Sequence, residues 1–146
     1  MKTVIQFKDV TLGDRLPPVN VEITQEVIDR NAVASLDYNP VHTNLGWCRT
    51  KSPFGLGKPV SHGMLTMSTM ASVVTGWCYE SGASIGLLEA KLTKPVPVGD
   101  RVTASGEVKE LHPLGPGRNQ VLVTLEARNG AGDLVATGSA RVEFRD

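Results

Sequence analysis

The stretch GMLTMSTMASVVTGW, residues 63–77, is the part of the sequence that decides the fold. Its side chains are apolar or small on nearly every side of a helix, a pattern typical of a helix that protein encloses all round. No Asp, Glu, Lys or Arg occurs between Lys58 and Glu80, and this gap is long enough to cross a bilayer. Serine and threonine residues interrupt it, however, and such a density of polar groups would be costly in hydrocarbon. We therefore expect a buried helix of a soluble protein and no membrane partner.

Four segments downstream of this helix have the alternation or the composition of β-strands. They are SIGLLEAKLT (84–93), RVTASGEVKEL (101–111), NQVLVTLEAR (119–128) and DLVATGSARVEF (133–144). Turn-forming clusters separate them, namely KPVPVGD at 94–100, HPLGPG at 112–117 and NGAGD at 129–133. The sequence thus predicts an α+β fold in which a long central helix is wrapped by a curved antiparallel β-sheet.

A second helix is predicted upstream, in TQEVIDRNAVAS at residues 24–35, with Thr24 as its N-cap and apolar residues at helical spacing. The 146 residues are enough for one hydrophobic core, and no internal repeat or low-complexity linker divides them. We expect a single domain over residues 1–146. Because one small sheet leaves an edge exposed, we also expect a homodimer with the functional site near the subunit boundary.

The composition limits the classes of partner. Hydrophobic residues make up 40% of the chain and charged residues 21%, which suits a globular protein. Fifteen basic residues balance fifteen acidic ones, so no overall positive field attracts nucleic acid or an anionic membrane. Cys48 and Cys78 lack metal spacing and are too few for a disulfide scaffold, so we expect two free thiols in a reducing compartment. The amino-terminal MKTVIQFKDV has no apolar run of signal-peptide length, which indicates the cytoplasm.

Residues 35–42, SLDYNPVH, hold a carboxylate and an imidazole close together. Pro40 disfavours helical geometry at Asn39, and Asn39 tolerates tight turns, so we expect the segment to be a rigid turn. Asp37 and His42 then converge, and two such side chains sharing one water molecule are suited to general acid and base catalysis. The alternative is structural, because an Asp before Asn-Pro often only ends a helix and a lone His is more often a surface residue.

KPVSHGMLTMS, residues 58–68, places Ser61, His62 and Gly63 directly before or at the start of the long helix. Unpaired backbone N–H groups and the positive end of the helix dipole point outward there. Gly63 lets another atom approach its N–H closely because it has no side chain, which is what an oxyanion needs. The structural alternative makes Gly63 a helix-entry glycine and His62 a capping or packing residue. For His62 we favour that alternative.

The two motifs together resemble the MaoC-like dehydratases and the related (R)-specific enoyl-CoA hydratases. The signature of that family is an Asp, any residue, Asn-Pro, any residue and a His, which this chain matches with Asp37, Asn39, Pro40 and His42. The resemblance continues through HGM at 62–64 and KPVPVGDRVTASGEV at 94–108, and so spans most of the chain from about Val21 onward. It is specific because two separate motifs occur in the right order.

The resemblance implies a hot-dog fold and the reversible hydration of a trans-2-enoyl thioester to the (R)-3-hydroxyacyl thioester. In that family the Asp and the His bind the catalytic water and share proton transfer, and a glycine N–H at the helix start holds the thioester oxygen. Those catalytic roles fall on Asp37, His42 and Gly63. The substrate carries coenzyme A or an acyl-carrier protein as its thiol, and we expect no other cofactor and no metal.

Further residues are candidates for binding the acyl thioester, although Asn39 is expected mainly to orient its loop. They are Asn39, Ser61, His62, Met64, Trp47 and Phe54. Trp47 and Phe54 could line an acyl tunnel, but aromatic packing under a loop is an equal or better interpretation. Met64 suits either an acyl pocket or the core, and we favour the core.

The sequence departs from the family pattern in two places. Leu36 stands where relatives commonly carry Gly or an acid, which affects the burial of the neighbouring carboxylate. The loop over residues 43–59 is longer than in compact relatives and could cover an acyl chain. Its cations Arg49, Lys51 and Lys58 could meet the phosphates of coenzyme A, but solvated surface charges are the favoured interpretation.

Three alternative functions stay open. A metal site formed by Asp37, His42 and His62 lacks a recognised ligand spacing. A hot-dog thioesterase would also use a carboxylate and the helix start, but such enzymes usually lack the Asn-Pro-x-His turn. A non-catalytic acyl-thioester-binding subunit is disfavoured because Asp37 and His42 are both present.

Overall fold

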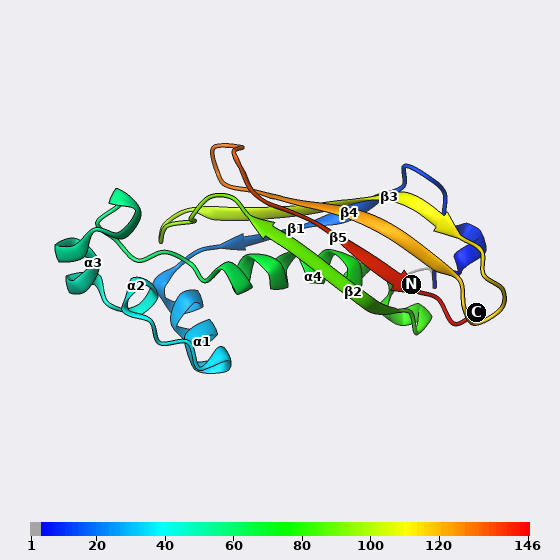
Figure 1. The fold of residues 1–146 in the computed structure, drawn as a ribbon, viewed down its shortest axis with the longest axis horizontal. Helices are drawn as coiled ribbons and strands as arrows, with labels where there is room; N and C mark the ends of the chain where they lie inside the picture. Colours follow the sequence, from blue (N-terminus) through cyan, green and yellow to red (C-terminus); the bar gives the residue numbers. More distant parts are fainter. Residues whose placement is uncertain (1–3) are drawn as a thin grey trace.

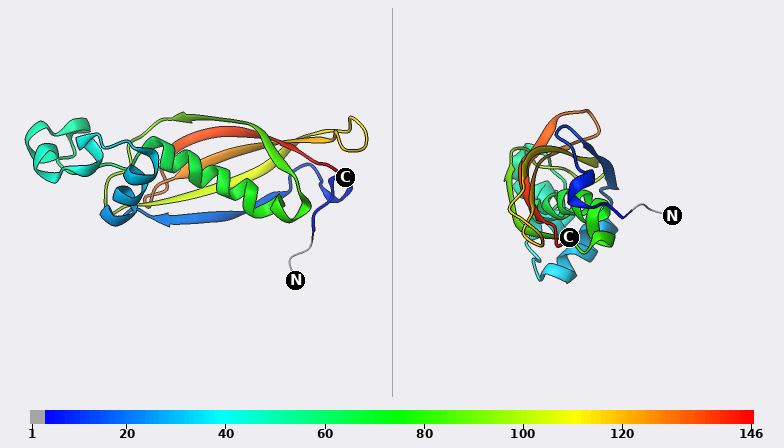
Figure 2. Two further views of the ribbon diagram at one scale, coloured as in Figure 1. Left: turned by 90° about the horizontal axis from the view of Figure 1, so that it is seen from below. Right: turned by 90° about the vertical axis from the view of Figure 1, so that its right-hand side faces the viewer.

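The protein consists of a curved antiparallel sheet and a long helix, in a computed structural model that describes residues 4–146 (Figure 1). The helix is α4 (Gly63–Cys78), and the strands are β1 (Arg15–Glu22), β2 (Ser84–Leu92), β3 (Arg101–His112), β4 (Gln120–Arg128) and β5 (Leu134–Glu143). The strands lie in the order β1-β3-β4-β5-β2, each antiparallel to its neighbours. Figure 2 shows the sheet curving round α4. The predicted α+β fold is confirmed.

The four strands predicted after the helix are present, with ends within one residue of those expected, but the sequence does not predict β1. Two prolines in it, Pro17 and Pro18, argue against a strand because proline cannot donate to a ladder. β1 lies at the edge of the sheet, next to β3, and the pairing register shifts between Leu16 and Val19. The edge and this irregularity accommodate both prolines. The four predicted strands are therefore confirmed, and the sequence-based prediction lacks only the edge strand that precedes the helix.

The hydrophobic core lies between the concave face of the sheet and one side of α4. Buried residues alternate along β4 as its sequence predicts, at Val121, Val123 and Leu125. They belong to the same hydrophobic cluster as Met70 and Val73 of α4. Full burial of such a side chain contributes about 1.5–3 kcal/mol. Apolar contact with the sheet therefore holds the helix in position.

One side of α4 is uncovered in the single chain. Met64, Ser68, Thr75 and Gly76 are exposed and recur at helical spacing. The expectation that protein encloses the helix all round is therefore wrong for the single chain. The reason is the open sheet, whose outer strands β1 and β2 lie at opposite edges, so that the sheet covers only one side of the helix.

Three short helices lie at the end of the molecule where α4 begins (Figure 2). They are α1 (Gln25–Ser35), α2 (Pro40–Thr43) and α3 (Leu45–Lys51). Thr24 caps α1 by accepting a hydrogen bond from the N–H of Val27 at 3.2 Å, as predicted. α1 buries Ile28 and Ala32 and so anchors the segment that carries the first motif.

Several expectations concern location and oxidation state. In residues 4–146 no helix is both long and apolar enough to cross a membrane. Residues 1–3 of MKTVIQFKDV, the stretch used to exclude a signal peptide, lie outside the described residues. Cys48 and Cys78 are buried free thiols, as expected. The single domain over residues 1–146 stays a prediction.

Candidate active site

In the first motif, SLDYNPVH at residues 35–42, side chains accept hydrogen bonds from backbone N–H groups of the same segment. Leu36 is the C-cap residue of α1, and its left-handed φ of 59° turns the chain toward Asp37. A glycine adopts this conformation at less cost. A carboxylate oxygen of Asp37 accepts a hydrogen bond from the N–H of Asn39 at 3.2 Å. Asn39 caps α2 by accepting from the N–H of Val41 at 3.1 Å, and Pro40 occupies the first turn. The expected rigid turn therefore leads directly into one helical turn, which the sequence does not predict.

The ring of His42, on α2, lies next to Asp37. Its Nδ1 is 2.7 Å from the carbonyl oxygen of Val60 and therefore carries the proton that it donates. In the neutral ring Nε2 is then an acceptor, and it lies 3.8 Å from a carboxylate oxygen of Asp37. This separation is too long for a direct hydrogen bond, but one water molecule can bond to both atoms. The acid and the imidazole thus lie side by side.

His62 lies behind this pair and is only 2% exposed. Its ring stacks on that of His42, with centroids 3.8 Å apart and planes inclined by 27°. Nε2 of His62 donates a hydrogen bond to the main-chain carbonyl of Asp37 at 2.9 Å. Nδ1 is buried and has no hydrogen-bond partner in the described part of the chain. His62 is therefore a packing residue of the motif, the interpretation that we favour from the sequence.

Asp37, His42 and His62 also form a cluster that could hold a metal ion, since one possible ligand atom of each lies within 4.8 Å of the others. The two imidazole rings are stacked, however, and nitrogen lone pairs lie in the plane of their ring. Lone pairs of stacked rings do not converge on one ion. Nε2 of His62 is also occupied by its hydrogen bond to the chain. The donor set therefore suits a bound water better than a tetrahedral metal.

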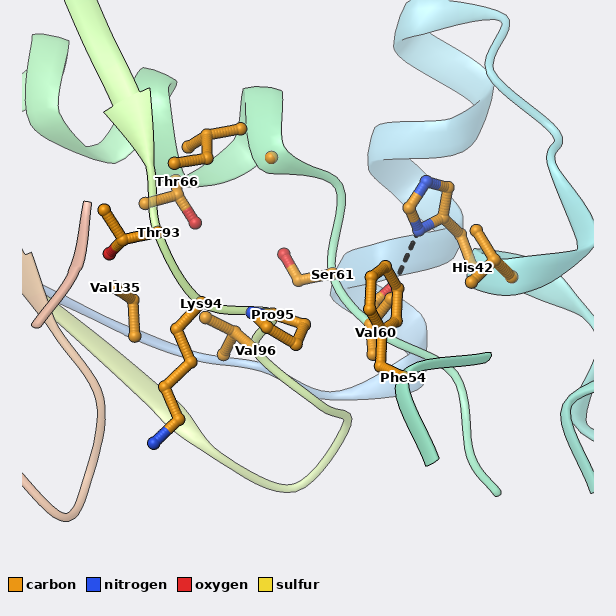
Figure 3. Close-up of a pocket in the computed structure, with 13 residues that line it drawn as sticks. His42, Phe54, Val60, Ser61, Thr66, Thr93, Lys94, Pro95, Val96 and Val135 are labelled. Atoms are coloured by element: carbon orange, nitrogen blue, oxygen red, sulfur yellow. Dashed lines mark hydrogen bonds between the residues drawn. The ribbon is translucent and has the colours of Figure 1, made fainter. Parts of the chain in front are cut away.

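A cavity of about 430 Å³ opens beside His42 at the start of α4 (Figure 3). It is lined by α2, by residues 60–66 in part, by residues 92–96 at and after the end of β2, and by Val135 of β5. Most of these side chains are apolar. An acyl chain is therefore the type of ligand that the cavity suits.

Gly63 forms part of the cavity wall and is the first residue of α4. The first N–H groups of a helix have no acceptor within the helix, and that of Gly63 has none elsewhere in residues 4–146. Leu92 packs against Gly63 where a Cβ would stand, so any larger residue would displace Leu92. The glycine thus leaves room both for its neighbour and for an oxygen atom at its N–H.

The candidate binding residues divide into two groups. Ser61 and Phe54 line the cavity, and Phe54 is exposed at its rim. The other candidates do not line it; they are Asn39, His62, Met64 and Trp47. Asp37 also lies outside the lining, with its carboxylate half exposed beside His42.

Met64 and Trp47 lie away from the cavity for different reasons. Met64 is 59% exposed on the uncovered side of α4, so the favoured interpretation of it as core is wrong for the single chain. Trp47 is half-buried on α3, where its backbone N–H donates to the capping side chain of Asn44. In the single chain neither side chain is positioned to contact a ligand in this cavity.

The charged lining comes from a different segment than the sequence suggests. Arg49, Lys51 and Lys58 are exposed, and none of them lines the cavity. Lys94 does line it, and its ammonium group donates to a carboxylate oxygen of Asp133 at 2.7 Å. That hydrogen bond lowers the pKa of Asp133 below its usual value. From the sequence, Lys94 is expected only to belong to the turn KPVPVGD, although that segment is part of the family resemblance.

Thr66 is a second lining residue that is not among the candidates predicted from the sequence. It follows Gly63 by three residues, and residues at this spacing lie on the same face of a helix. That spacing was the available signal. In the sequence, however, the hydroxyl groups of the helix count only as interruptions of an apolar run.

Comparisons with known proteins bear on the family and the fold of the chain. The family model described as a MaoC like domain matches residues 9–130 of the chain. The search of curated proteins finds none that is significantly similar to this chain. Among solved structures, the (R)-hydratase from A. caviae involved in PHA biosynthesis is 25% identical, with a TM-score of 0.83 over 94% of this chain and 98% of that one.

Two further solved structures show the fold alone, because their identities are lower. The R-hydratase PhaJ1 from Pseudomonas aeruginosa, in its unliganded form, is 23% identical with a TM-score of 0.87, over 98% of this chain and 87% of that one. A chain of the ChsH1-ChsH2 complex from Mycobacterium tuberculosis is 24% identical with a TM-score of 0.77, over 92% and 98% of the two chains. The hot-dog fold expected from the resemblance is confirmed.

Proposed function

This chain belongs to the MaoC-like domain family, and from that premise we propose that it catalyses the reversible addition of water to a trans-2-enoyl thioester, giving the (R)-3-hydroxyacyl thioester. The observation that carries the proposal is the 3.8 Å separation between Nε2 of His42 and the carboxylate of Asp37. The pair stands beside an apolar cavity whose wall includes the helix start at Gly63. The likeness to an (R)-hydratase supports the stereochemistry.

The proposed reaction uses the three groups in sequence. Asp37 orients a water molecule, which loses a proton to Nε2 of His42 as its oxygen bonds to C3 of the enoyl group. The electron pair of the C2=C3 bond moves toward the thioester oxygen. There the N–H of Gly63 stabilises the developing charge, and donors of this kind contribute about 3 kcal/mol. The enolate then takes a proton at C2 from the Asp37–His42 pair, so that one whole water molecule has been added.

The proposed chemistry needs no cofactor besides the thioester carrier. Addition of water is neither an oxidation nor a reduction, and the acid and base are side chains of the protein. Coenzyme A and an acyl-carrier protein remain alternative carriers. A cytoplasmic location likewise stays a prediction.

The test is incubation with crotonyl-CoA, followed by the loss of enoyl absorbance and by a separate assay for released thiol. We expect absorbance to fall without thiol release. Asp37→Asn should lower kcat by about 10²- to 10⁴-fold, because general acid and base catalysis typically contributes that much. Asp29→Asn is the matched control, since Asp29 is an exposed carboxylate on α1, and its kcat should equal that of the wild type.

Two results would replace the proposal. Thiol release without hydration would make the protein a thioesterase. Binding of acyl-CoA without turnover of enoyl or 3-hydroxyacyl thioesters of several chain lengths would make it a non-catalytic binding subunit. Wild-type kcat in Asp37→Asn would reject the assigned water-binding pair.

We also propose that the chain forms a homodimer through the edge of β2. The opposite edge strand, β1, contains Pro17 and Pro18, which hinder further strand pairing. On β2, Leu87 and Leu92 are half exposed, and the nearby side of α4 is uncovered. Light scattering should give a mass of twice 15.6 kDa. A mass of 15.6 kDa at all concentrations would reject the dimer.

A further inference from the structure

The hydroxyl groups of α4 do not all have the same partner. Four of them donate to a main-chain carbonyl three or four residues earlier in the helix; they belong to Ser68, Thr69, Ser72 and Thr75. Such bonds are the usual way in which Ser and Thr are satisfied within a helix. Thr66 is the fifth hydroxyl of the helix, and among residues 4–146 it has no hydrogen-bond partner.

The reason lies at the carbonyl that Thr66 would use. Four residues before Thr66 is His62, whose carbonyl oxygen already accepts from the N–H of Leu65 at 3.0 Å. It also accepts from the hydroxyl of Ser61 at 3.2 Å. A carbonyl oxygen has two lone pairs, so both positions are taken. The hydroxyl of Thr66 is therefore left without the acceptor four residues earlier, the kind of acceptor that Ser68 and Thr69 use.

The free hydroxyl belongs to a buried residue that lines the cavity. Thr66 is only 4% exposed, and Figure 3 shows its oxygen directed to the side of the cavity where Ser61 lies. The other hydroxyls of the lining already donate to main-chain carbonyls, Ser61 to His62 and Thr93 to Leu134. Thr66 is therefore the hydroxyl of the lining that is available to a ligand.

Thr66 is also close to the proposed oxyanion position. It lies one turn after Gly63, and helix side chains lean back toward the helix N-terminus. Its hydroxyl therefore leans toward the end of α4 at which the N–H of Gly63 is free. Both groups line the same cavity. An oxygen atom placed between them can accept from both.

We propose that the hydroxyl of Thr66 donates a second hydrogen bond to the thioester oxygen that the N–H of Gly63 binds. This inference rests on the proposed hydration of an enoyl thioester. Charge moves onto that oxygen as water adds to C3, so a preorganised donor acts mainly on the transition state. The helix start then supplies one main-chain donor and one side-chain donor.

The experiment compares Thr66→Val, Thr66→Ser and Thr69→Val in the crotonyl-CoA assay. Valine keeps the shape of threonine without the hydroxyl, and serine keeps the hydroxyl. Thr66→Val should lower kcat by about tenfold to a hundredfold with KM changed by less than about twofold, while Thr66→Ser stays near the wild type. Thr69 is the matched control, because it is equally buried on the same helix but bonds to the carbonyl of Leu65. Thr69→Val should keep the wild-type kcat.

Thermal unfolding provides a readout that does not depend on activity. Thr66→Val removes a hydroxyl without a protein partner and should keep or raise Tm, whereas Thr69→Val breaks a hydrogen bond and should lower it. A similar fall in Tm for both would mean that the hydroxyl of Thr66 is already bonded in the free protein. That result would overturn the proposal.

The kinetic outcomes separate this inference from the proposed function. If the wild type hydrates crotonyl-CoA and Asp37→Asn does not, an unchanged kcat in Thr66→Val rejects the second donor alone. An increase in KM without loss of kcat also rejects it, since the hydroxyl would then bind substrate and transition state equally. A loss in Thr66→Ser as large as in Thr66→Val would assign the effect to packing. A wild type without hydratase activity would reject both proposals.

Discussion

His42 and His62 each donate a hydrogen bond from one ring nitrogen to a main-chain carbonyl. This bond fixes the orientation of the ring and therefore the place of its second nitrogen. His42 donates from Nδ1 to Val60, which leaves Nε2 free on the side of Asp37. His62 donates from Nε2 to the carbonyl of Asp37 itself. The position of the carboxylate therefore depends on a residue that does not line the cavity.

We predict that His62 acts by positioning Asp37, and variants can separate its hydrogen bond from its ring. His62→Gln keeps a donor near the Nε2 position, whereas His62→Phe keeps a flat ring and loses the donor. His62→Phe should lower kcat for crotonyl-CoA by about tenfold to a hundredfold with little change in KM, because small displacements of a catalytic group cost that much. His62→Gln should retain more activity than His62→Phe.

The control is a double-mutant cycle with Asp37→Asn. If His62 acts through Asp37, then His62→Phe has little further effect once the carboxylate is gone. Additive losses would mean that His62 contributes independently of Asp37. Equal losses in His62→Gln and His62→Phe would mean that the ring, and not the donor, matters.

Local sequence order explains which site residues the sequence reveals. Asp37, His42 and Gly63 stand in two short motifs, and the role proposed for each is the one that the family resemblance of these motifs implies. The hydrogen bond of His62 reaches a carbonyl 25 residues away, which no local pattern encodes. The free hydroxyl of Thr66 depends on two other donors occupying one carbonyl, and this is visible only in three dimensions.

At the level of elements, long and regular sequence patterns predict helices and strands well. The exceptions can be explained only from the arrangement of the whole sheet. The helix α4 and the strands β2 to β5 are predicted with ends close to those observed. For the strands the signal is apolar alternation, which reflects burial on one face, and for α4 it is a long run of apolar and small residues. β1 is not predicted because its two prolines argue against a strand, and a sheet accommodates them only at its edge. The uncovered side of α4 is not predicted either. Apolar residues on all sides of a helix indicate burial, but they do not distinguish burial by the same chain from burial by a second one.

Gly138, on β5, is the position at which the sheet tolerates no side chain. A Cβ there would collide with the main-chain carbonyl of Glu89 on β2 and crowd Met70 of α4. The carbonyl cannot move without disturbing the β2–β5 ladder. Gly138→Ala should therefore lower the free energy of unfolding by about 1–3 kcal/mol, measured by urea denaturation.

The control for this prediction is Gly76→Ala. Gly76 lies in α4, and a Cβ there meets no atom within 4 Å. Alanine restricts the unfolded chain and favours a helix, so this change should raise the free energy of unfolding by about 0.5–1 kcal/mol. The two Gly→Ala substitutions should thus change the free energy of unfolding in opposite directions. A Gly138→Ala variant as stable as the wild type would show that the sheet can shift to admit a methyl group.

At the scale of the whole molecule, packing is uneven along its length. α4 contacts each of the five strands, and the strands contact one another. α2 packs mainly against α1 and α3, and α3 mainly against α2. Figure 2 shows α3 at the far end of the molecule, beyond the sheet. Segments with few buried contacts open more easily than a core. The end that carries His42 should therefore open at a lower free-energy cost than the sheet and α4.

The two cysteines report on these two regions separately. Cys48 is buried on α3, and Cys78 is buried at the end of α4, where burial raises the pKa of its thiol to about 11. The Cys78 thiol therefore stays protonated at pH 8 and reacts with a disulfide reagent only after its region opens. The variant Cys78→Ala keeps only Cys48, and Cys48→Ala keeps only Cys78. Each labelling rate is divided by the rate for the same thiol in the unfolded chain. We expect the resulting value for Cys48 to be at least about tenfold higher than that for Cys78. Low concentrations of urea should accelerate the labelling of Cys78 more steeply, because its exposure requires the larger surface to open. Equal rates with equal urea dependence would mean that the α2–α3 end opens only when the whole molecule unfolds.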